Sequence, residues 1–211
     1  MIARRTRIVA PKPPSQTVVG HLHLHVRVPK KSPTLDKLPP RDEDGLYHVV
    51  IETPKGSPHK LVYDKKLGAF KLGAIMPEGS TFPFDFGFIP STLGDDGDPL
   101  DVLLLMDHPL TPGTVVPTRL IGVITGEQSE DGEEPEQNDR LIGVSPESPL
   151  YKKTKTLSEL PQELVTQLEK FFVNYNEQRG KKFMPKGSHG WKTAETLFLK
   201  GQKKFARKRR G

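Results

Sequence analysis

The sequence predicts an α+β fold: a small closed β-barrel of about five strands, two C-terminal helices that flank it, and an N-terminal extension that contains one strand. Short apolar segments separated by turns rich in Gly and Pro occupy residues 46–144, which is typical of a compact barrel. Apolar residues at helical spacing follow Ser158. We therefore divide the chain into an extension (residues 1–45), a main domain (46–206) and a basic tail (207–211).

Composition narrows the function. The 211 residues fit one domain with extensions, and the net charge of +6 favours polyanionic partners such as phosphates. The absence of Cys excludes disulfides and thiolate metal ligands. No run approaches the ~20 apolar residues that cross a bilayer, and the first residues lack the apolar core of a secretory signal. We expect a cytoplasmic protein without membrane contact.

The extension begins with a basic, Pro-containing arm at residues 1–17. Thr17–Val28 then alternates between polar and apolar residues, the period of a half-buried strand. His21, His23 and His25 share its polar face, which either binds a metal or is simply solvated. Pro29–Gly45 is expected to be a linker.

The main domain shows a series of short strands divided by turns. We expect them at Tyr47–Glu52, Lys60–Asp64, Ala69–Ile75, Asp101–Met106, Thr114–Thr125 and Arg140–Val144. Ser129–Asp139 carries six acidic residues and no hydrophobic residue, so we expect an exposed loop there.

Two helices are expected after the strands. Ser158 is a good N-cap with Pro161 in the first turn, and the apolar stripe ends near Gly180. Most of the stripe belongs in the core, but Tyr175 at its end has room for a second role. A shorter helix is expected from Thr193 to about Ala206.

The stretch Leu93–Met106 carries the clearest chemical signal. Four carboxylates, Asp95, Asp96, Asp98 and Asp101, precede five apolar residues that resemble a buried strand. Each pair of like charges ~4 Å apart costs about 1 kcal/mol even in water, so a cation is expected between them. Mg²⁺ prefers such oxygen ligands. Gly97 and Pro99 favour a bend that brings Asp96, Asp98 and Asp101 together.

Three further interpretations of this stretch are weaker. An EF-hand loop counted from Asp96 would need a glycine at its sixth position and a glutamate at its twelfth, where the chain has Asp101 and Asp107. A phosphatase with an aspartate nucleophile would need the apolar strand before the motif rather than after it. A plain turn, in which Asp and Gly satisfy backbone groups, stays open.

The segment Asp-Gly-Asp-Pro-Leu-Asp-Val at residues 96–102 resembles the signature of the soluble, Mg²⁺-dependent inorganic pyrophosphatases of family I. The similarity extends from about Leu46 to about Ala206, and under it the expected barrel is OB-like. Further segments resemble the same family in the same order; they are residues 49–54, 59–64, 86–90, 109–113, 121–123 and 171–175.

The resemblance implies roles for individual residues. Asp96 and Asp101 would bind the tightest metal ion, Asp101 would bridge to a second, and Asp98 would take the proton of the attacking water. Glu52 and Asn138 match other metal positions. The residues that match phosphate-binding positions are Lys60, Arg140 and Tyr175.

Several positions depart from the family pattern. A glutamate, an arginine, two tyrosines, a metal-binding aspartate and a phosphate-binding lysine are replaced by Val62, Ala74, Phe82, Phe86, Asn138 and Asn176, respectively. A further metal aspartate aligns near Gln128, where Glu127, Glu130, Asp131 or Asp139 could stand in. Lys71, Lys152 and Lys153 could compensate for the lost cations. Because one lost transition-state contact costs about 3 kcal/mol, reduced or altered activity is expected.

The expected function is hydrolysis of inorganic pyrophosphate by a metal-activated water, with Mg²⁺ or Mn²⁺ as cofactor. The alternatives are a non-catalytic relative that binds metal, phosphate or a partner, and a hydrolase of another diphosphate. Nucleic-acid binding is not expected, since terminal charge runs are usually solvated. The sequence leaves room for a homo-oligomer.

Overall fold

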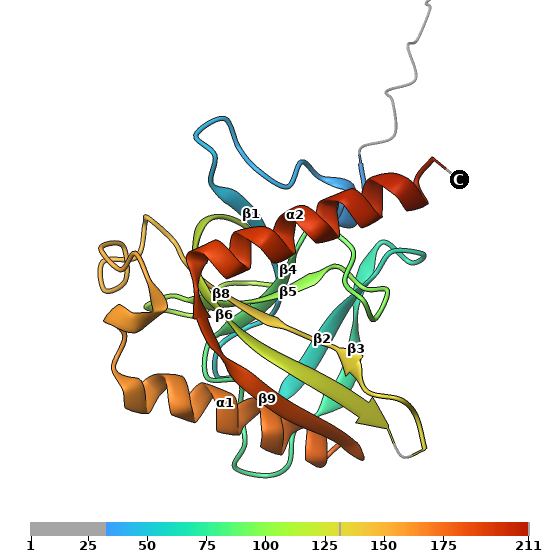
Figure 1. Ribbon diagram of the computed structural model, residues 1–211, viewed down its shortest axis with the longest axis vertical. Coiled ribbons are helices and arrows are strands. Elements are labelled where there is room, and N and C mark those ends of the chain that lie inside the picture. The colour runs from blue at the N-terminus through green and yellow to red at the C-terminus, as the bar shows by residue number, and fades with distance from the viewer. Residues whose placement is uncertain (1–32, 131, 211) are drawn as a thin grey trace, which may run out of the picture. The chain divides into compact units, whose positions relative to one another are not determined.

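The structure, a computed structural model, describes residues 33–130 and 132–210 (Figure 1). The predicted basic arm and the predicted strand Thr17–Val28, with its three His, lie outside the described residues. The described part of the predicted linker contains one 3-10 helix, η1 (Leu35–Lys37). Two hydrogen bonds join this segment to Ser91, whose N–H donates to Asp36 O (2.9 Å) and whose hydroxyl donates to Leu38 O (2.9 Å).

Strands dominate the first two thirds of the described chain and helices the rest. The strands are β1 (Tyr47–Thr53), β2 (His59–Asp64), β3 (Ala69–Ile75), β4 (Asp85–Ile89), β5 (Leu100–Leu105), β6 (Val115–Glu130), β7 (Glu136–Gln137), β8 (Arg140–Val144) and β9 (Lys181–Gly190). The helices are η2 (Leu157–Glu159), α1 (Gln162–Glu177) and α2 (Trp191–Lys208).

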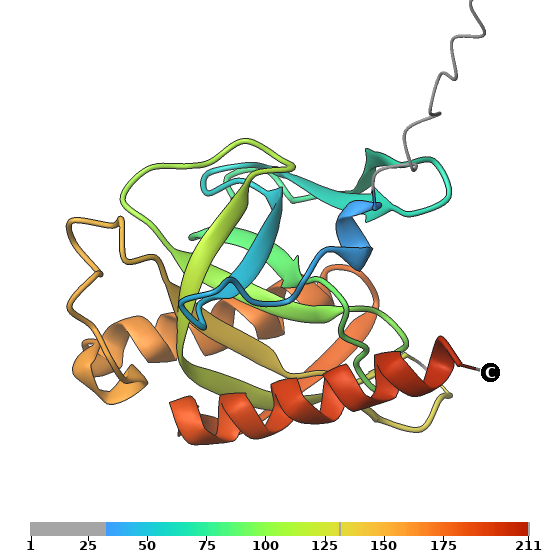
Figure 2. The same ribbon diagram turned by 90° about the horizontal axis from the view of Figure 1, so that it is seen from above.

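The main sheet is mixed and closes on itself. Its strands follow the order β1-β4-β5-β8-β6, and the start of β6 also pairs with β1, which completes a ring of five strands. The β5–β8 pair is parallel and the other pairs of the ring are antiparallel. The hairpin of β2 and β3 forms a separate sheet beside the ring (Figure 2). The predicted α+β class with two C-terminal helices is confirmed.

Alternation along the strands builds two hydrophobic cores. Leu103 and Ile142 pack into the core that α1 completes with Leu168 and Phe172. Their strand neighbours, such as Val102, point into the other core, to which α2 contributes Ala194 and Phe198. Figure 1 shows α2 along one side of the strands and α1 along the other. No helix in the described ranges is long and apolar enough to cross a membrane.

The start of the first predicted helix was wrong. Ser158 lies inside η2, and α1 begins at Gln162 with Pro161 at the N-cap position, where no side chain caps the helix. Leu160 is extended (φ −79°, ψ 150°), because a residue before proline is disfavoured in helical conformation. The second helix is slightly longer than expected.

The predicted exposed loop at Ser129–Asp139 was partly wrong as well. β6 continues to Glu130 and pairs with both β7 and β9, because backbone hydrogen bonds between strands do not require apolar side chains. Asn138, at the end of this segment, is buried. The strands β4, β7 and β9 were absent from the predicted set.

Candidate active site

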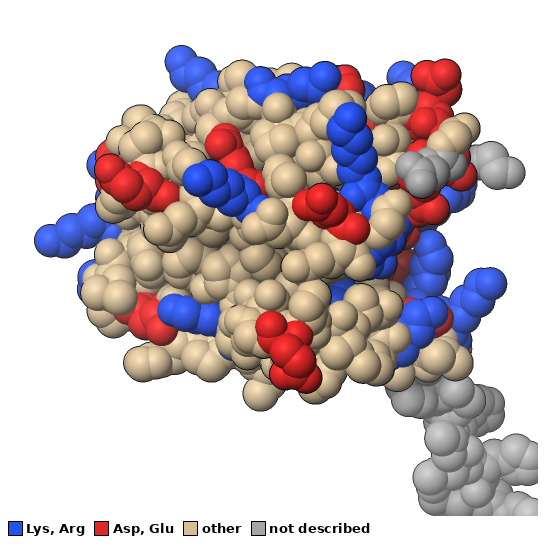
Figure 3. All heavy atoms as spheres, turned by 90° about the horizontal axis from the view of Figure 1, so that it is seen from below, with Lys and Arg blue, Asp and Glu red and all other residues tan. Residues whose placement is uncertain are grey.

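A cavity of about 1140 Å³, the main cavity, lies where β1, β2, β5, β8 and α1 meet. All eight residues predicted for the site line it; they are Glu52, Lys60, Asp96, Asp98, Asp101, Asn138, Arg140 and Tyr175. In the view from below, Lys and Arg side chains gather with Asp and Glu around a recess at one side of the molecule (Figure 3). The arrangement suits a ligand that carries both negative charge, for the Lys and Arg side chains, and positive charge, for the Asp and Glu side chains.

Residues 93–99, the acidic loop, carry Asp96 and Asp98 to the cavity. Gly94 N–H donates to Asp98 O (2.7 Å), and Asp98 N–H donates to Asp96 Oδ1 (3.1 Å). Gly97 occupies the left-handed region (φ 85°), which glycine adopts without strain. The local turn therefore presents the two aspartates together.

Electrostatic crowding acts on Asp96. Although this side chain is exposed to the cavity, the surrounding protein displaces water from it and raises its pKa to about 6, with further increases from the charges of Asp101 and Asp98. Among residues 33–130 and 132–210, no three His, Asp or Glu side chains form a cluster that could hold a metal ion. The three aspartates line the main cavity without forming such a cluster.

Strand register brings Asp101 beside Arg140. β5 and β8 are parallel with Val102 opposite Leu141, so the two preceding residues are adjacent. Arg140 Nη1 lies 2.8 Å from Asp101 Oδ2 and also donates to Asn138 Oδ1. Arg140 is buried, and its Nε has no hydrogen-bond partner among the described residues. One guanidinium thus connects the carboxylate of β5 to the amide that precedes β8.

Glu52 and Lys60 form a second charged pair. Their Oε2 and Nζ atoms are 3.6 Å apart, and Glu52 Oε1 accepts a hydrogen bond from Tyr63 N–H (2.6 Å). Burial raises the pKa of Glu52, which the Lys60 charge opposes. Burial lowers the pKa of Lys60, whose Nζ lies 3.8 Å from the centroid of the Phe86 ring. Desolvation destabilises the charged form of both groups, and a ligand that places a cation beside Glu52 and an anion beside Lys60 would offset this cost.

Tyr175 enters the cavity from α1. The side chain is almost fully buried, and burial raises the pKa of its phenol, which therefore stays protonated at neutral pH. Its hydroxyl accepts a hydrogen bond from Arg179 Nη1 (2.7 Å). Asn176 beside it donates from Nδ2 to Phe172 O (2.8 Å), so its amide is committed to the helix.

The structure adds cations that sequence reasoning did not select. These are Arg179, Lys208 and Arg209, which line the main cavity. Of the three lysines named from the sequence as possible compensation, Lys71 lines the main cavity and pairs with Asp64 (2.8 Å). Lys152 and Lys153 are not among the lining residues. The spacing of four residues between Tyr175 and Arg179 on a predicted helix is the signal that could have identified Arg179.

The acidic residues of segment 127–139 differ in whether they line the main cavity. Glu130 lines the main cavity and pairs with Lys181, whereas Glu127 pairs with Lys186 (2.9 Å). Asp139 Oδ1 accepts hydrogen bonds from Gln137 Nε2 and Gly126 N–H. Of the candidate replacements for the missing metal aspartate, Glu130 therefore faces the main cavity; Asp131 lies outside the described residues.

Known proteins resemble this chain over most of its length. A family model described as inorganic pyrophosphatase matches residues 49–205. The inorganic pyrophosphatase of Thermus thermophilus is 37% identical over 163 residues, which cover 77% of this chain and 87% of that protein. The inorganic pyrophosphatase of Neisseria meningitidis serogroup B is 41% identical over 142 residues, which cover 66% of this chain and 77% of that protein.

Solved structures agree. The crystal structure of the Thermus thermophilus inorganic pyrophosphatase has a TM-score of 0.75 at 34% identity, and the match covers 82% of this chain and 99% of that chain. For an inorganic pyrophosphatase from Neisseria gonorrhoeae the TM-score is 0.68 at 35% identity, with 79% and 95% covered.

Proposed function

Because the chain belongs to family I of the soluble inorganic pyrophosphatases, it hydrolyses inorganic pyrophosphate to two phosphates, and we propose that the residues of the main cavity divide this reaction among metal binding, proton transfer and phosphate binding. One observation carries the proposal. Eight side chains selected from the sequence, spread over more than 120 positions from Glu52 to Tyr175, line a single cavity.

The residues that would hold divalent metal are Glu52, Asp96, Asp98, Asp101 and Asn138. This donor set consists of carboxylate and amide oxygens, which suit Mg²⁺ or Mn²⁺. Burial, together with the charges of Asp101 and Asp98, raises the pKa of Asp96, and a bound cation would offset both effects. Bound Mg²⁺ supplies a water of lowered pKa and neutralises phosphate oxygens.

Asp98 is the proposed base. It faces the cavity beside Asp96, and the hydrogen bond from its own N–H to Asp96 Oδ1 fixes its backbone. Its carboxylate takes the proton of the attacking water. Such a step contributes roughly 10² to 10⁴ in rate.

Four residues hold the phosphates. Arg140 supplies buried positive charge and Lys60 largely buried positive charge. The Tyr175 hydroxyl donates a hydrogen bond, and Arg179 adds a planar guanidinium that can bind two oxygens at once. These cations offset the charge that develops on the leaving phosphate.

The remaining expectations belong to the same proposal. We infer an OB-like barrel for the ring of strands, a cytoplasmic location, and a pyrophosphatase domain at residues 46–206 between the extension and the basic tail. Pyrophosphate or a related diphosphate is the partner, no nucleic acid is required, and a homo-oligomer is compatible with the fold.

The decisive variant is Asp98→Asn, which preserves size and leaves Asp96 and Asp101 to hold metal. We expect phosphate release from pyrophosphate to fall at least a hundredfold, while Mg²⁺ still raises the melting temperature. Asp44→Asn, in an exposed turn outside the cavity, is the matched control and should behave as wild type.

Two results would contradict the proposal. Equal activity of Asp98→Asn and wild type would remove the base from this position. If the wild-type protein released phosphate from pyrophosphate and other diphosphates no faster than buffer, the protein would not be an enzyme of this kind. It would then be a non-catalytic relative that binds metal or phosphate.

A further inference from the structure

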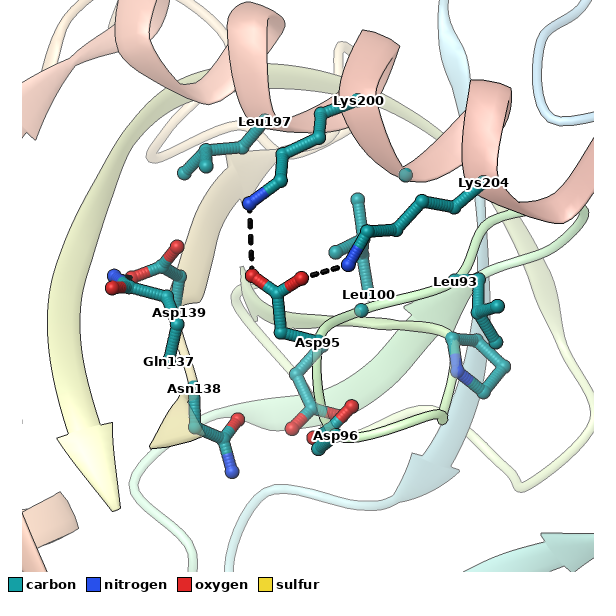
Figure 4. Close-up of a pocket in the computed structure, with 14 residues that line it drawn as sticks. Leu93, Asp95, Asp96, Leu100, Gln137, Asn138, Asp139, Leu197, Lys200 and Lys204 are labelled. Carbon is teal, nitrogen blue, oxygen red and sulfur yellow. Dashed lines mark hydrogen bonds and ion pairs between the residues drawn. The ribbon is translucent and has the colours of Figure 1, made fainter. Parts of the chain in front are cut away.

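Asp95, the fourth carboxylate of the acidic loop, turns away from the main cavity. It lines a small side pocket of about 30 Å³ between the loop, residues 137–139 and α2 (Figure 4), which Asp96 and Asp101 line as well. There its carboxylate pairs with two lysines of α2, with Lys200 Nζ 2.8 Å from Oδ2 and Lys204 Nζ on Oδ1. Asp95 is absent from the lining of the main cavity, to which Asp96 and Asp98 belong.

Gly201 joins the same helix face to both ends of the loop. Its carbonyl accepts a hydrogen bond from Leu93 N–H (3.1 Å) at the start of the loop. A Cβ at this position would lie 2.8 Å from Leu100 Cδ1 and 3.3 Å from Leu93 O. Glycine costs about 1 kcal/mol relative to alanine inside a helix, but here it permits the close approach of α2.

The contacts of α2 therefore enclose the turn that presents the metal ligands. Leu93 is held at one end, Leu100 at the other, and Asp95 between them. The bond between Gly94 N–H and Asp98 O then closes the turn. Release of Asp95 would free the backbone next to Asp96.

We propose that Lys200 and Lys204 are positioning residues, which act through Asp95 to keep Asp96 and Asp98 directed into the main cavity and so set the affinity for divalent cations. The inference rests on the proposed function, in which the acidic loop binds metal. A loop ordered in advance loses less entropy when the cation binds, and its affinity is higher.

The direction of the change in Mg²⁺ affinity separates positioning from simpler effects of the two lysines. If these partly exposed contacts were ordinary surface ion pairs, their removal would change neither the stability nor the Mg²⁺ affinity by much. As a purely electrostatic effect, removal of two positive charges close to the carboxylates would strengthen Mg²⁺ binding. Positioning alone predicts that removal of the lysines weakens Mg²⁺ binding.

The test compares two double variants of the full chain. Lys200→Ala with Lys204→Ala removes the contacts, and Lys192→Ala with Lys203→Ala removes the same charge from exposed positions of α2 outside both cavities. Mg²⁺ binding is measured by calorimetry without substrate. We expect the dissociation constant to rise at least fivefold in the first variant and to stay within twofold of wild type in the second.

Three further measurements separate positioning from general damage. The Mg²⁺ concentration for half-maximal pyrophosphate hydrolysis should rise by the same factor, with kcat at saturating Mg²⁺ within twofold of wild type. Lys200→Arg with Lys204→Arg should restore most of the affinity. In an Asp95→Ala background, removal of the lysines should no longer weaken Mg²⁺ binding, because the shared contact is already lost.

The outcomes are distinguishable. Unchanged or tighter Mg²⁺ binding after loss of the two lysines would overturn this inference and leave the proposed function intact. A lower melting temperature with unchanged Mg²⁺ affinity would do the same, since the contact would then be structural only. A wild-type protein that binds no Mg²⁺ would overturn the metal site itself, and this inference with it.

Discussion

We propose that Arg179 binds the substrate in the main cavity. Its guanidinium donates to the Tyr175 hydroxyl and lines the main cavity at the end of α1. A charged hydrogen bond contributes about 1.5–3 kcal/mol, and for this exposed side chain we expect the lower value, about tenfold in kcat/KM. Steady-state hydrolysis of pyrophosphate by Arg179→Ala measures this loss.

The control for Arg179 is a cation of α1, the helix that precedes it. Lys170→Ala removes an exposed charge of α1 outside the cavity and should leave kcat/KM unchanged. Arg179→Lys should fall between the two, because an ammonium keeps the charge but not the planar fork. Wild-type kinetics in Arg179→Ala would exclude it from the phosphate-binding set.

Single residues also show where prediction from the sequence ends. Asp96, Asp98 and Asp101 could be selected because their spacing is local. Asp95 has the same chemistry and the same sequence neighbours. What directs it elsewhere is its pairing with Lys200 and Lys204, which lie 105 and 109 positions further along the chain. No local pattern contains such a contact.

At the scale of elements, β9 was unpredictable for a related reason. Its sequence contains Pro185 and two glycines and lacks alternating hydrophobic residues, so it has no strand signal of its own. Its pairing with the second half of β6 supplies the backbone hydrogen bonds instead. The six predicted strands, by contrast, carry their apolar pattern in their own residues, and all six are present.

Phe183 is the buried hydrophobic residue that attaches β9 to the core of α1. Its ring centroid lies 6.2 Å from that of Phe172 and 5.7 Å from the Arg140 guanidinium carbon. Phe183→Ala should cost about 3–5 kcal/mol in the free energy of unfolding, or roughly 6–20 °C in melting temperature. Denaturant unfolding of this variant beside Lys182→Ala, an exposed neighbour on the strand, provides the measurement. Equal stability of the two would show that β9 is held by its backbone alone.

At the scale of the whole molecule, part of the N-terminal extension contacts the rest of the fold. The family model begins at residue 49, so residues before it lie outside the part of the chain that this model matches. However, the described part of the extension is attached at two distant places. Ser91, close to the acidic loop, bonds to Asp36 and Leu38, and Arg41 pairs with Glu195 of α2 (2.6 Å). These contacts connect residues 36–41 to the domain that we propose at residues 46–206.

Two truncations test this difference. Removal of residues 1–16, which are basic and rich in Pro, should leave melting temperature and turnover within a few-fold of wild type. Removal of residues 1–41 also deletes the bonds to Ser91 and the Arg41–Glu195 pair, so we expect a lower melting temperature and a higher Mg²⁺ requirement for hydrolysis. The second effect follows because Ser91 lies just before the loop that carries Asp96 and Asp98.

If the longer truncation matched the shorter one in both measurements, residues 33–41 would have no part in the site. If the shorter truncation lost activity while it stayed folded, the basic arm would reach the substrate.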